Sequence, residues 1–171
     1  MPHITLYDVR RRQLPVLDRL MQLYLHDFDE YLSEGVDESG RFALDFDLRR
    51  YVREPGFWAY LCWVDDRLGG FSLISERVEH RTGPGRFIDE FFVLRTYRHQ
   101  GVGRRLAHLT FDTFAGYWEV VALEPNQPAV AFWQTVIADY TQGAYETFTI
   151  VEDGMGLVWY TFDSAGQRSG E

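Results

Sequence analysis

The pattern of helices and strands in the sequence predicts a mixed fold, of class α/β or α+β. Short apolar runs with strand periodicity alternate along the chain with longer segments whose apolar residues recur at helical spacing. The 171 residues, 46% of them hydrophobic and 16% aromatic, suffice to bury one core, and no composition shift marks a second domain. We expect residues 1–163 to form this domain and the small, polar residues 164–171 to form a flexible tail.

The first third of the chain is expected to hold one strand and two helices. Residues 3–9 alternate between apolar and polar side chains, which is typical of a strand. Pro15 can begin a helix, and the apolar residues from Leu14 to Leu32 keep helical spacing, so a long helix follows. An acidic loop at 35–40 leads to a short second helix at 44–53, which ends before Pro55.

The remaining two thirds are expected to hold six strands and two helices. Residues 57–64 and 68–79 form a hairpin around residues 65–67, and a turn at 81–85 leads to a strand at 86–94. A helix at 101–115, a strand at 118–123 and a helix at 128–140 follow, and strands at 145–151 and 157–162 close the fold.

Charge and motif content exclude several classes of function. The net charge of −9, from 17 basic and 26 acidic residues, argues against a nucleic-acid partner and suits a cationic acceptor. The N-terminal residues do not have a signal-peptide pattern and no apolar run has membrane length, so we expect a cytoplasmic protein without a membrane partner. The five histidines and the single Cys62 do not have metal-ligand spacing, so we expect no metal site. Cys62, within an apolar strand, is interpreted as a buried side chain.

Residues 91–107 carry the strongest functional signal. An apolar strand runs into a turn that contains glycines and arginines, and the turn runs into a helix. This order places free backbone N–H groups and the positive end of a helix dipole together, which is what a bound pyrophosphate needs. A dinucleotide fingerprint would require a small residue at Leu106, and a P-loop would require a lysine, of which the chain has none.

Two segments then match one family. The spacing Arg98-x-x-Gly101-x-Gly103 resembles the acetyl-CoA pyrophosphate motif of the GNAT superfamily of N-acetyltransferases. Residues 124–133 resemble the second cofactor segment of that family, which begins at Asn126 here. The resemblance covers nearly all of residues 3–163. It implies an α+β fold, an α/β sandwich with a mostly antiparallel central sheet of seven strands flanked by four helices.

The resemblance implies that acetyl-CoA is the cosubstrate and that the turn wraps its pyrophosphate. Four arginines in or beside the turn would oppose the helix dipole unless an anion is bound, so Arg95 and Arg105 are expected to add charge for the phosphates. The alternative is a solvated basic helix start. The residues expected at the pyrophosphate are Arg98, His99, Gln100, Gly101, Val102, Gly103 and Arg104.

The strand before the turn is expected to hold the reacting groups. In the family, the pantetheine arm pairs with the backbone at Phe92 and Val93, and the N–H of Val93 polarises the thioester carbonyl. Glu90 matches the position of the general base in many relatives, with Asp89 as its alternative. Strand alternation would send these two acids to opposite faces, and either could simply face solvent.

Asn126 and Trp133 complete the predicted site. The resemblance implies that Asn126 contacts the pantetheine arm, although an asparagine ahead of Pro128 is also a good helix N-cap. Trp133 stands where the family usually has a tyrosine that protonates the leaving thiolate, and an indole does not titrate as an acid. The proton would then come from water, from Tyr140 or from Tyr145.

These residues predict an N-acetyltransferase that moves acetyl from acetyl-CoA to a primary amine of a small, cationic molecule by direct attack in a ternary complex. A catalytically weak acyl-CoA sensor or scaffold, favoured by Trp133, and an enzyme acting on a protein or peptide amine are the alternatives. The acidic residues between His26 and Glu38 are interpreted either as a mouth that attracts cations or as a solvated loop. The resemblance also implies a homodimer that pairs through the last strands.

Overall fold

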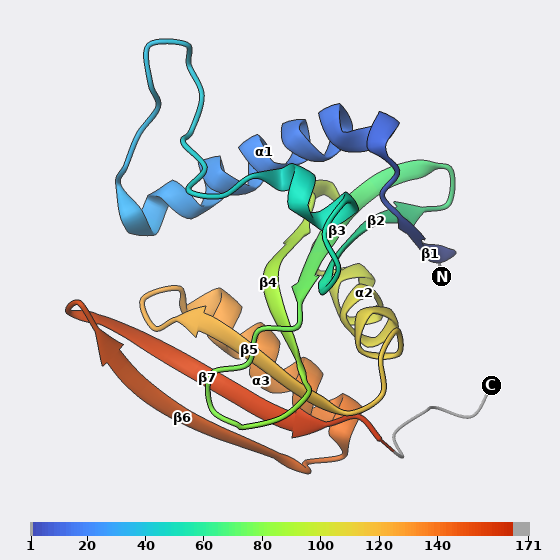
Figure 1. Ribbon diagram of the computed structural model, residues 1–171, viewed down its shortest axis with the longest axis vertical. Helices are drawn as coiled ribbons and strands as arrows, with labels where there is room; N and C mark the ends of the chain where they lie inside the picture. The colour runs from blue at the N-terminus through green and yellow to red at the C-terminus, as the bar shows by residue number, and fades with distance from the viewer. Residues whose placement is uncertain (1, 166–171) are drawn as a thin grey trace.

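The computed structural model describes residues 2–165, which fold around one seven-stranded β-sheet (Figure 1). The strand order is β1-β2-β3-β4-β5-β7-β6, and neighbours are antiparallel except β4 and β5, which are parallel. The predicted α+β class is therefore confirmed. The strands are β1 (Ile4–Asp8), β2 (Phe57–Val64), β3 (Arg67–Ser75), β4 (Arg86–Val93), β5 (Tyr117–Leu123), β6 (Tyr145–Glu152) and β7 (Met155–Asp163).

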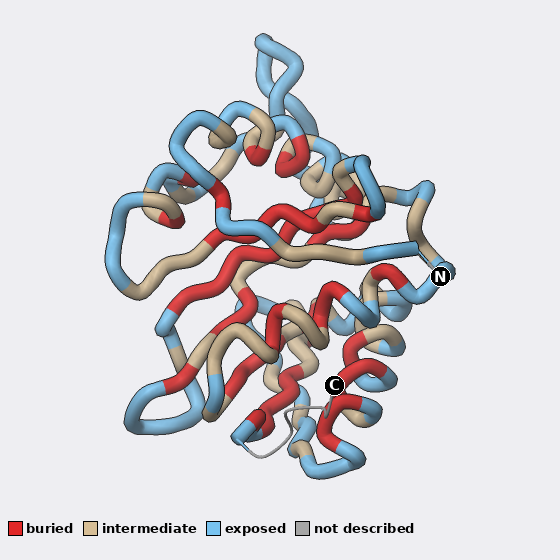
Figure 2. Tube along the Cα trace, turned by 90° about the vertical axis from the view of Figure 1, so that its right-hand side faces the viewer, coloured by how far each residue is buried: buried red, intermediate tan, exposed pale blue. Residues whose placement is uncertain are grey.

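Helices cover both faces of the sheet, so that the molecule has three layers. Helix α1 (Leu14–Leu32) lies over β2, β3 and β4, whereas α2 (Val102–Phe111) and α3 (Gln127–Thr141) cover the opposite face. One buried cluster lies under α1 and the largest lies under α2 and α3. Figure 2 shows these buried segments between the layers and the exposed residues on the outside of the helices.

The helix count differs from the prediction. Three α-helices lie within residues 2–165, because the second predicted helix, at 44–53, is only the 3₁₀ helix η2 (Leu48–Val52). Asp47 accepts a hydrogen bond from the N–H of Arg49, which begins the turn late, and Pro55 prevents its extension. The helix predicted at 101–115 ends earlier, at Phe111.

A buried glutamate explains why the strand predicted at 68–79 ends at Ser75. The Glu119 side chain of β5 is fully buried and accepts hydrogen bonds from the N–H groups of Glu79 and His80, at 2.8 and 2.9 Å. The hydroxyl of Tyr117 donates to the same carboxylate at 3.0 Å. These bonds fold the segment between β3 and β4 across the sheet instead of continuing the strand.

Ser164, the first residue of the tail predicted at 164–171, is packed into the folded structure. Ser164 is buried, its N–H donates to the carbonyl of Gly116, and its Oγ accepts from the N–H of that glycine. It is therefore part of the folded domain. Residues 166–171 of the predicted tail lie outside the described residues.

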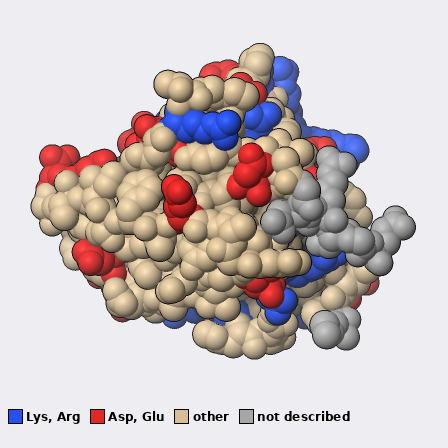
Figure 3. Space-filling view, turned by 90° about the horizontal axis from the view of Figure 1, so that it is seen from below, with Lys and Arg blue, Asp and Glu red and all other residues tan. Residues whose placement is uncertain are grey.

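The described surface offers few extended features. Seen from below, uncharged atoms make up most of the described surface, and basic side chains gather along the upper edge of that face (Figure 3). Within residues 2–165, the helices are all too short or too polar to span a bilayer.

Candidate active site

The turn between β4 and α2 has the backbone geometry of an anion site. Gly101 is the N-cap of α2 in the left-handed conformation (φ +79°), and as a glycine it offers no side chain to cap the helix. The first intrahelical bond runs from the N–H of Arg105 to the carbonyl of Gly101, at 3.0 Å. The N–H groups of Val102, Gly103 and Arg104 therefore precede the hydrogen-bonded helix and lie at the positive end of its dipole.

The two motif glycines have different physical roles. The positive φ of Gly101 favours a residue without a Cβ. At Gly103, an added Cβ would lie 3.0 Å from the ring of Phe132, so this glycine allows α2 to approach α3 closely. His99 and Gln100 are exposed within the turn, and Val102 is completely buried beneath it.

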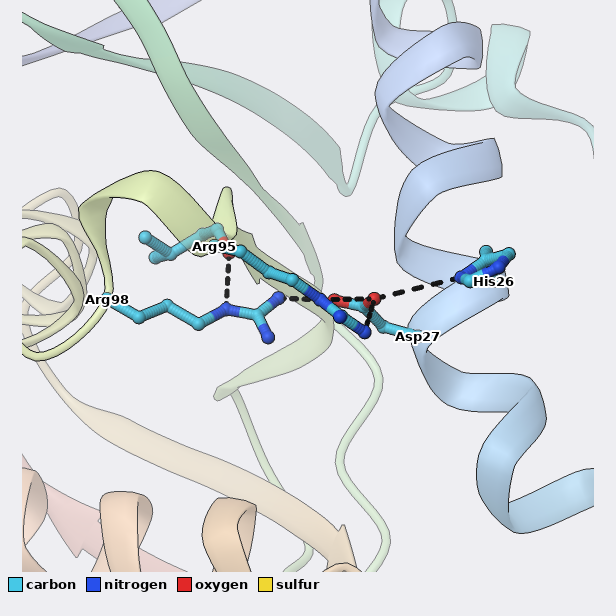
Figure 4. Close-up of polar contacts among 5 residues, drawn as sticks. His26, Asp27, Arg95 and Arg98 are labelled. Atoms are coloured by element: carbon cyan, nitrogen blue, oxygen red, sulfur yellow. Dashed lines mark hydrogen bonds and ion pairs between the residues drawn. The ribbon is translucent and has the colours of Figure 1, made fainter.

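The arginines near the turn are mostly paired with carboxylates. Arg104 contacts Asp139 of α3 at 2.6 Å, and Arg95 contacts Asp27 of α1 at 2.6 Å. Arg98 donates from Nε to the carbonyl of Val93 at 2.8 Å and from Nη2 to Asp27 (Figure 4). The expectation that four uncompensated arginines oppose the dipole is wrong, because acids from two other helices balance three of them. Arg105 is exposed and has no ion-pair partner among the described residues.

Strands β4 and β5 separate at the point where the cofactor arm was predicted. They pair only at Arg86 with Trp118 and at Phe87 with Glu119. The N–H of Leu94 donates to the carbonyl of Gly69 on β3, and alternate residues of an antiparallel strand point their backbone groups the same way. The N–H groups of Phe91 and Val93 therefore point away from β3, into the gap beside β5.

Phe92 has the opposite orientation. Its backbone pairs with Phe71 of β3, and its carbonyl lies so close to Gly70 that a Cβ there would collide with it. Its side chain is buried under α1, with its ring 6.0 Å from that of Tyr24. The prediction that Phe92 contacts the cofactor is therefore not matched by the direction of its backbone or its side chain.

Asp89 and Glu90 lie on the same face of the sheet, which contradicts the prediction from strand alternation. Ile88 pairs with Ile74 and Glu90 pairs with Leu73, so Asp89 is an extra residue that forms a β-bulge. The hydroxyl of Ser75 donates to Asp89 at 3.0 Å. Tyrosines from the α1 side act on both acids. Burial raises the pKa of Asp89 and of Glu90, whereas the Tyr51 hydroxyl lowers the pKa of Asp89 and the Tyr24 hydroxyl lowers that of Glu90.

The environment of Glu90 brings the pKa of its carboxyl group close to neutral pH. Burial raises the pKa of Glu90 to about 7, the hydrogen bond from Tyr24 works against this rise, and the charges of Asp89 and Asp45 add to it. Burial and the nearby Glu90 raise the pKa of Tyr24 well above its usual range, so the phenol remains a neutral donor. The sequence did not identify Tyr24 as a functional residue, because it belongs to the apolar stripe of the first helix.

Asn126 directly precedes α3, and Trp133 lies within this helix. The Asn126 side-chain oxygen accepts from the N–H of Ala129 at 3.1 Å, so its predicted alternative role as an N-cap is confirmed. Its amide NH₂ does not have a hydrogen-bond partner within the described residues and stays available as a donor. Trp133 is buried and contacts the ring of Phe91 at 4.8 Å, so it packs under the strand whose backbone faces the gap.

Neither of the two tyrosines suggested as proton donors lies at the gap. The hydroxyl of Tyr140 donates to Asp112 at 2.8 Å, beyond the C-terminal end of α2 and away from the cofactor turn. Tyr145 is on β6, which β5 and β7 separate from β4. In this structure, neither phenol is therefore placed to protonate a thiolate that leaves at the gap.

The acidic segment after α1 is largely used in local structure. Asp27 pairs with Arg95 and Arg98, and Asp29 accepts from the N–H groups of residues 34 and 35, at 2.7 and 2.9 Å. Asp37 accepts from the N–H groups of residues 39 and 41. Asp45 was not in the predicted cluster, but it is the exposed acid of this loop whose charge acts on Glu90.

Solved structures of acetyltransferases share this fold. The fold is similar to that of spermidine N-acetyltransferase from Vibrio cholerae in complex with CoA and spermine (TM-score 0.68, 11% identity, 97% of this chain and 98% of that chain). It is also similar to an acetyltransferase from Thermus thermophilus (0.67, 17%, 94% and 96%). Naa50 from Arabidopsis thaliana, in complex with a bisubstrate analogue, is similar too (0.58, 17%, 92% and 97%).

These identities are low, so the solved structures show the shared fold alone. The curated protein sequences contain no match to this chain. The family model described as "Acetyltransferase (GNAT) family" matches residues 17–136. This match includes most of α1, the acids of β4, the cofactor turn and the first two thirds of α3, and it covers well over half of the 171 residues. The protein therefore belongs to the GNAT family of acetyltransferases.

Proposed function

We propose that this acetyltransferase moves the acetyl group of acetyl-CoA to a primary amine of a small molecule, by direct attack in a ternary complex. The observation that carries the proposal is Glu90, whose pKa of about 7 suits a general base. It lies on the strand whose last residue, Val93, points its N–H into the gap beside β5. A base and a carbonyl-polarising donor on one strand are what amide formation from a thioester requires.

The residues of the turn fit a pyrophosphate. The N–H groups of Val102, Gly103 and Arg104 would hold it, and the exposed Arg105 would contact a further phosphate. The main chain of Phe91 and Val93 would pair with the pantetheine arm as an added strand. The side chains of Arg98 and Arg104 would act by holding the turn, because carboxylates already pair with them.

The reaction begins when Glu90, acting through a water molecule, removes a proton from the bound ammonium, which leaves a neutral amine. The nitrogen lone pair attacks the thioester carbon, and the C=O electron pair moves to the oxygen, which accepts a hydrogen bond from the N–H of Val93. Collapse reforms the C=O bond and breaks the C–S bond. The second proton of the nitrogen then passes through water to the thiolate, because Trp133 cannot supply one.

Direct transfer is favoured over a covalent acyl-enzyme. Cys62, the single cysteine, is completely buried in β2, and burial raises the pKa of its thiol to about 11. A thiol of that pKa is a poor nucleophile at neutral pH, and β3 lies between its strand and β4.

A cationic acceptor is favoured by the charges around Glu90. Asp89 lies beside it on the bulge, and Asp45 is exposed above it, with Arg77 as an opposing charge. An ammonium group would relieve the repulsion between these carboxylates. The overall charge of −9 acts in the same direction.

A peptide amine is a second candidate acceptor. The tip of the loop between α1 and η2 projects from the body of the molecule instead of lying across β4 (Figure 1). An acceptor end that this loop does not cover would admit a longer chain.

Trp133 separately supports a weakly active acyl-CoA sensor, since the position usually held by an acid carries an indole.

Release of free thiol from acetyl-CoA tests the proposal against polyamines, aminoglycosides, amino acids and peptides. We expect turnover with a small cationic amine and a loss of about a hundredfold in Glu90→Gln. Glu152→Gln, an exposed change at the end of β6, is the matched control and should keep full activity. Tight acetyl-CoA binding without turnover on any amine would support the sensor, and turnover with peptides alone would support the second candidate.

A further inference from the structure

Asp27, near the C-terminal end of α1, binds two arginines of the cofactor turn (Figure 4). Its Oδ1 accepts from Nε and Nη2 of Arg95, at 3.0 and 2.6 Å. Its Oδ2 accepts from Nη2 of Arg98. The Nδ1 atom of His26 lies 3.9 Å from Oδ1. The Asp27 side chain is 20% exposed, so these pairs are better shielded from solvent than most surface ion pairs.

The two arginines differ in what else they touch. Arg95 is 71% exposed and bonds only Asp27 among the described side chains. Arg98 is 36% exposed, donates from Nε to the carbonyl of Val93 at 2.8 Å, and lies over the ring of Phe92 at 5.7 Å. Its guanidinium therefore joins the carboxylate of Asp27 to the backbone at the end of β4. A planar guanidinium has fixed donor directions, so it transmits the position of one partner to the other.

We propose that Asp27 is a positioning residue for the cofactor: through Arg98, it fixes the Val93 peptide and the turn that follows. This inference rests on the proposed function, in which the backbone at Val93 binds the acyl-pantetheine end. Asp27 itself touches neither the reacting atoms nor the pyrophosphate site. Its effect is to keep one conformation of the turn ready for the cofactor, which reduces the ordering needed on binding.

The competing interpretation is that Asp27 only neutralises charge. Two guanidinium groups beside a phosphate site would attract CoA more strongly if their acid were removed. The two interpretations predict opposite signs. Loss of the Asp27 charge weakens CoA binding if Asp27 positions the turn, and it strengthens CoA binding if Asp27 merely offsets the arginines.

Calorimetric titration of the full chain with CoA separates the two. We expect Asp27→Asn to weaken CoA binding about tenfold, which corresponds to about 1.4 kcal/mol. Arg98→Lys keeps the positive charge but loses the fork that reaches both Val93 and Asp27, so it should weaken binding by a similar factor. Asp18→Asn is the control, because Asp18 lies on the same helix as Asp27 and forms a comparable pair, at 2.6 Å, with Arg41 of the following loop. This variant should bind CoA as the wild type does.

The double variant tests whether Asp27 acts through Arg98. Asp27→Asn combined with Arg98→Lys should bind CoA about as weakly as either single variant, because both remove one bridge. The proposal would be overturned if the fold-losses of the two single variants multiplied in the double variant. It would also be overturned if Asp27→Asn bound CoA as tightly as the wild type or more tightly. If Asp27→Asn fails to fold, Arg98→Lys still tests the proposal. CoA binding by Arg98→Lys that is as tight as in the wild type would refute the bridge on its own.

Kinetics supply a readout that general loss of structure would not produce. In Asp27→Asn, the KM for acetyl-CoA should rise about tenfold while the KM for the amine stays within about twofold. A wild-type chain that binds no CoA would refute the proposed function itself. A wild type that binds CoA, with an Asp27→Asn variant of equal affinity, would refute only the role of Asp27.

Discussion

The hydroxyl of Tyr24 offers a direct test of the base assignment. Tyr24→Phe removes the hydrogen bond that holds the Glu90 pKa down, while burial and the nearby acids that raise the pKa stay in place. The ring contacts with Phe28, Phe71 and Phe92, at centroid distances of 5.4, 6.0 and 6.0 Å, remain available to phenylalanine. The change therefore perturbs the acidity of Glu90 with little change of packing.

The size of the shift follows from the bond that is lost. A hydrogen bond to an ionised group contributes about 1.5–3 kcal/mol, and about 1.4 kcal/mol corresponds to one pKa unit. Removing it disfavours the ionised carboxylate, so the pKa of Glu90 should rise by roughly one to two units. Since this pKa is about 7 in the wild type, the ionised base would form only at clearly alkaline pH in Tyr24→Phe.

The assay is the pH dependence of kcat/KM for the amine at saturating acetyl-CoA, which reports the ionisation of the enzyme before the amine binds. The rising limb should move to higher pH in Tyr24→Phe. Tyr31→Phe is the control, because it removes a hydroxyl from the same helix and Tyr31 is not among the groups that shift the pKa of Glu90. A limb that stays in place, moves to lower pH, or moves equally in the control would refute the assignment of Glu90 as the base.

Three further predictions concern the stability of the fold, the protonation of the leaving group and the absence of an acyl-enzyme. Because burial raises the pKa of Glu90 from 4.5 to about 7, the wild type loses stability as pH rises between these values. Glu90→Gln should remove this loss and unfold in urea with a free energy about 1–3 kcal/mol higher at alkaline pH, and equal stabilities there would contradict the burial argument. Trp133→Tyr should keep kcat within about threefold if water carries the proton, so a tenfold rise would contradict that route. Cys62→Ala should retain turnover, and a complete loss in a folded variant would instead indicate an acyl-enzyme.

The sequence predicted the sheet well because its strands are governed by local patterns. The β2–β3 hairpin, the cofactor turn and α3 lie within a few residues of their predicted positions, since periodicity, Gly101 and Pro128 act locally. The prediction of the second helix was wrong because its start depends on a side-chain cap at Asp47, which competes with apolar spacing over a short segment. The strand predicted at 68–79 was too long because Glu119, distant in sequence, binds the backbone that follows β3.

The site shows the same division between local and distant causes. The N–H groups of the turn follow from the order strand, turn and helix, and so they could be predicted. The common face of Asp89 and Glu90 could not, because a β-bulge is a feature of the pairing with β3 and reverses the alternation. The partners of the arginines were equally hidden, since Asp27 and Asp139 come from other helices. Tertiary charge compensation is not visible in the spacing of one segment.

The positions of Glu90 and Val93 constrain how the proton must travel. The two residues are three apart on β4, which places their backbones about 10 Å apart at the rise of a strand. An amine within about 3.5 Å of a carbonyl bound at the N–H of Val93 is therefore too far for direct contact with the Glu90 carboxylate, whose side chain bonds Tyr24 on the α1 side. A water molecule between the amine and Glu90 closes that distance. The alignment then depends on α1, because Tyr24 and Asp27 lie one turn apart on it and hold the base and the cofactor turn respectively.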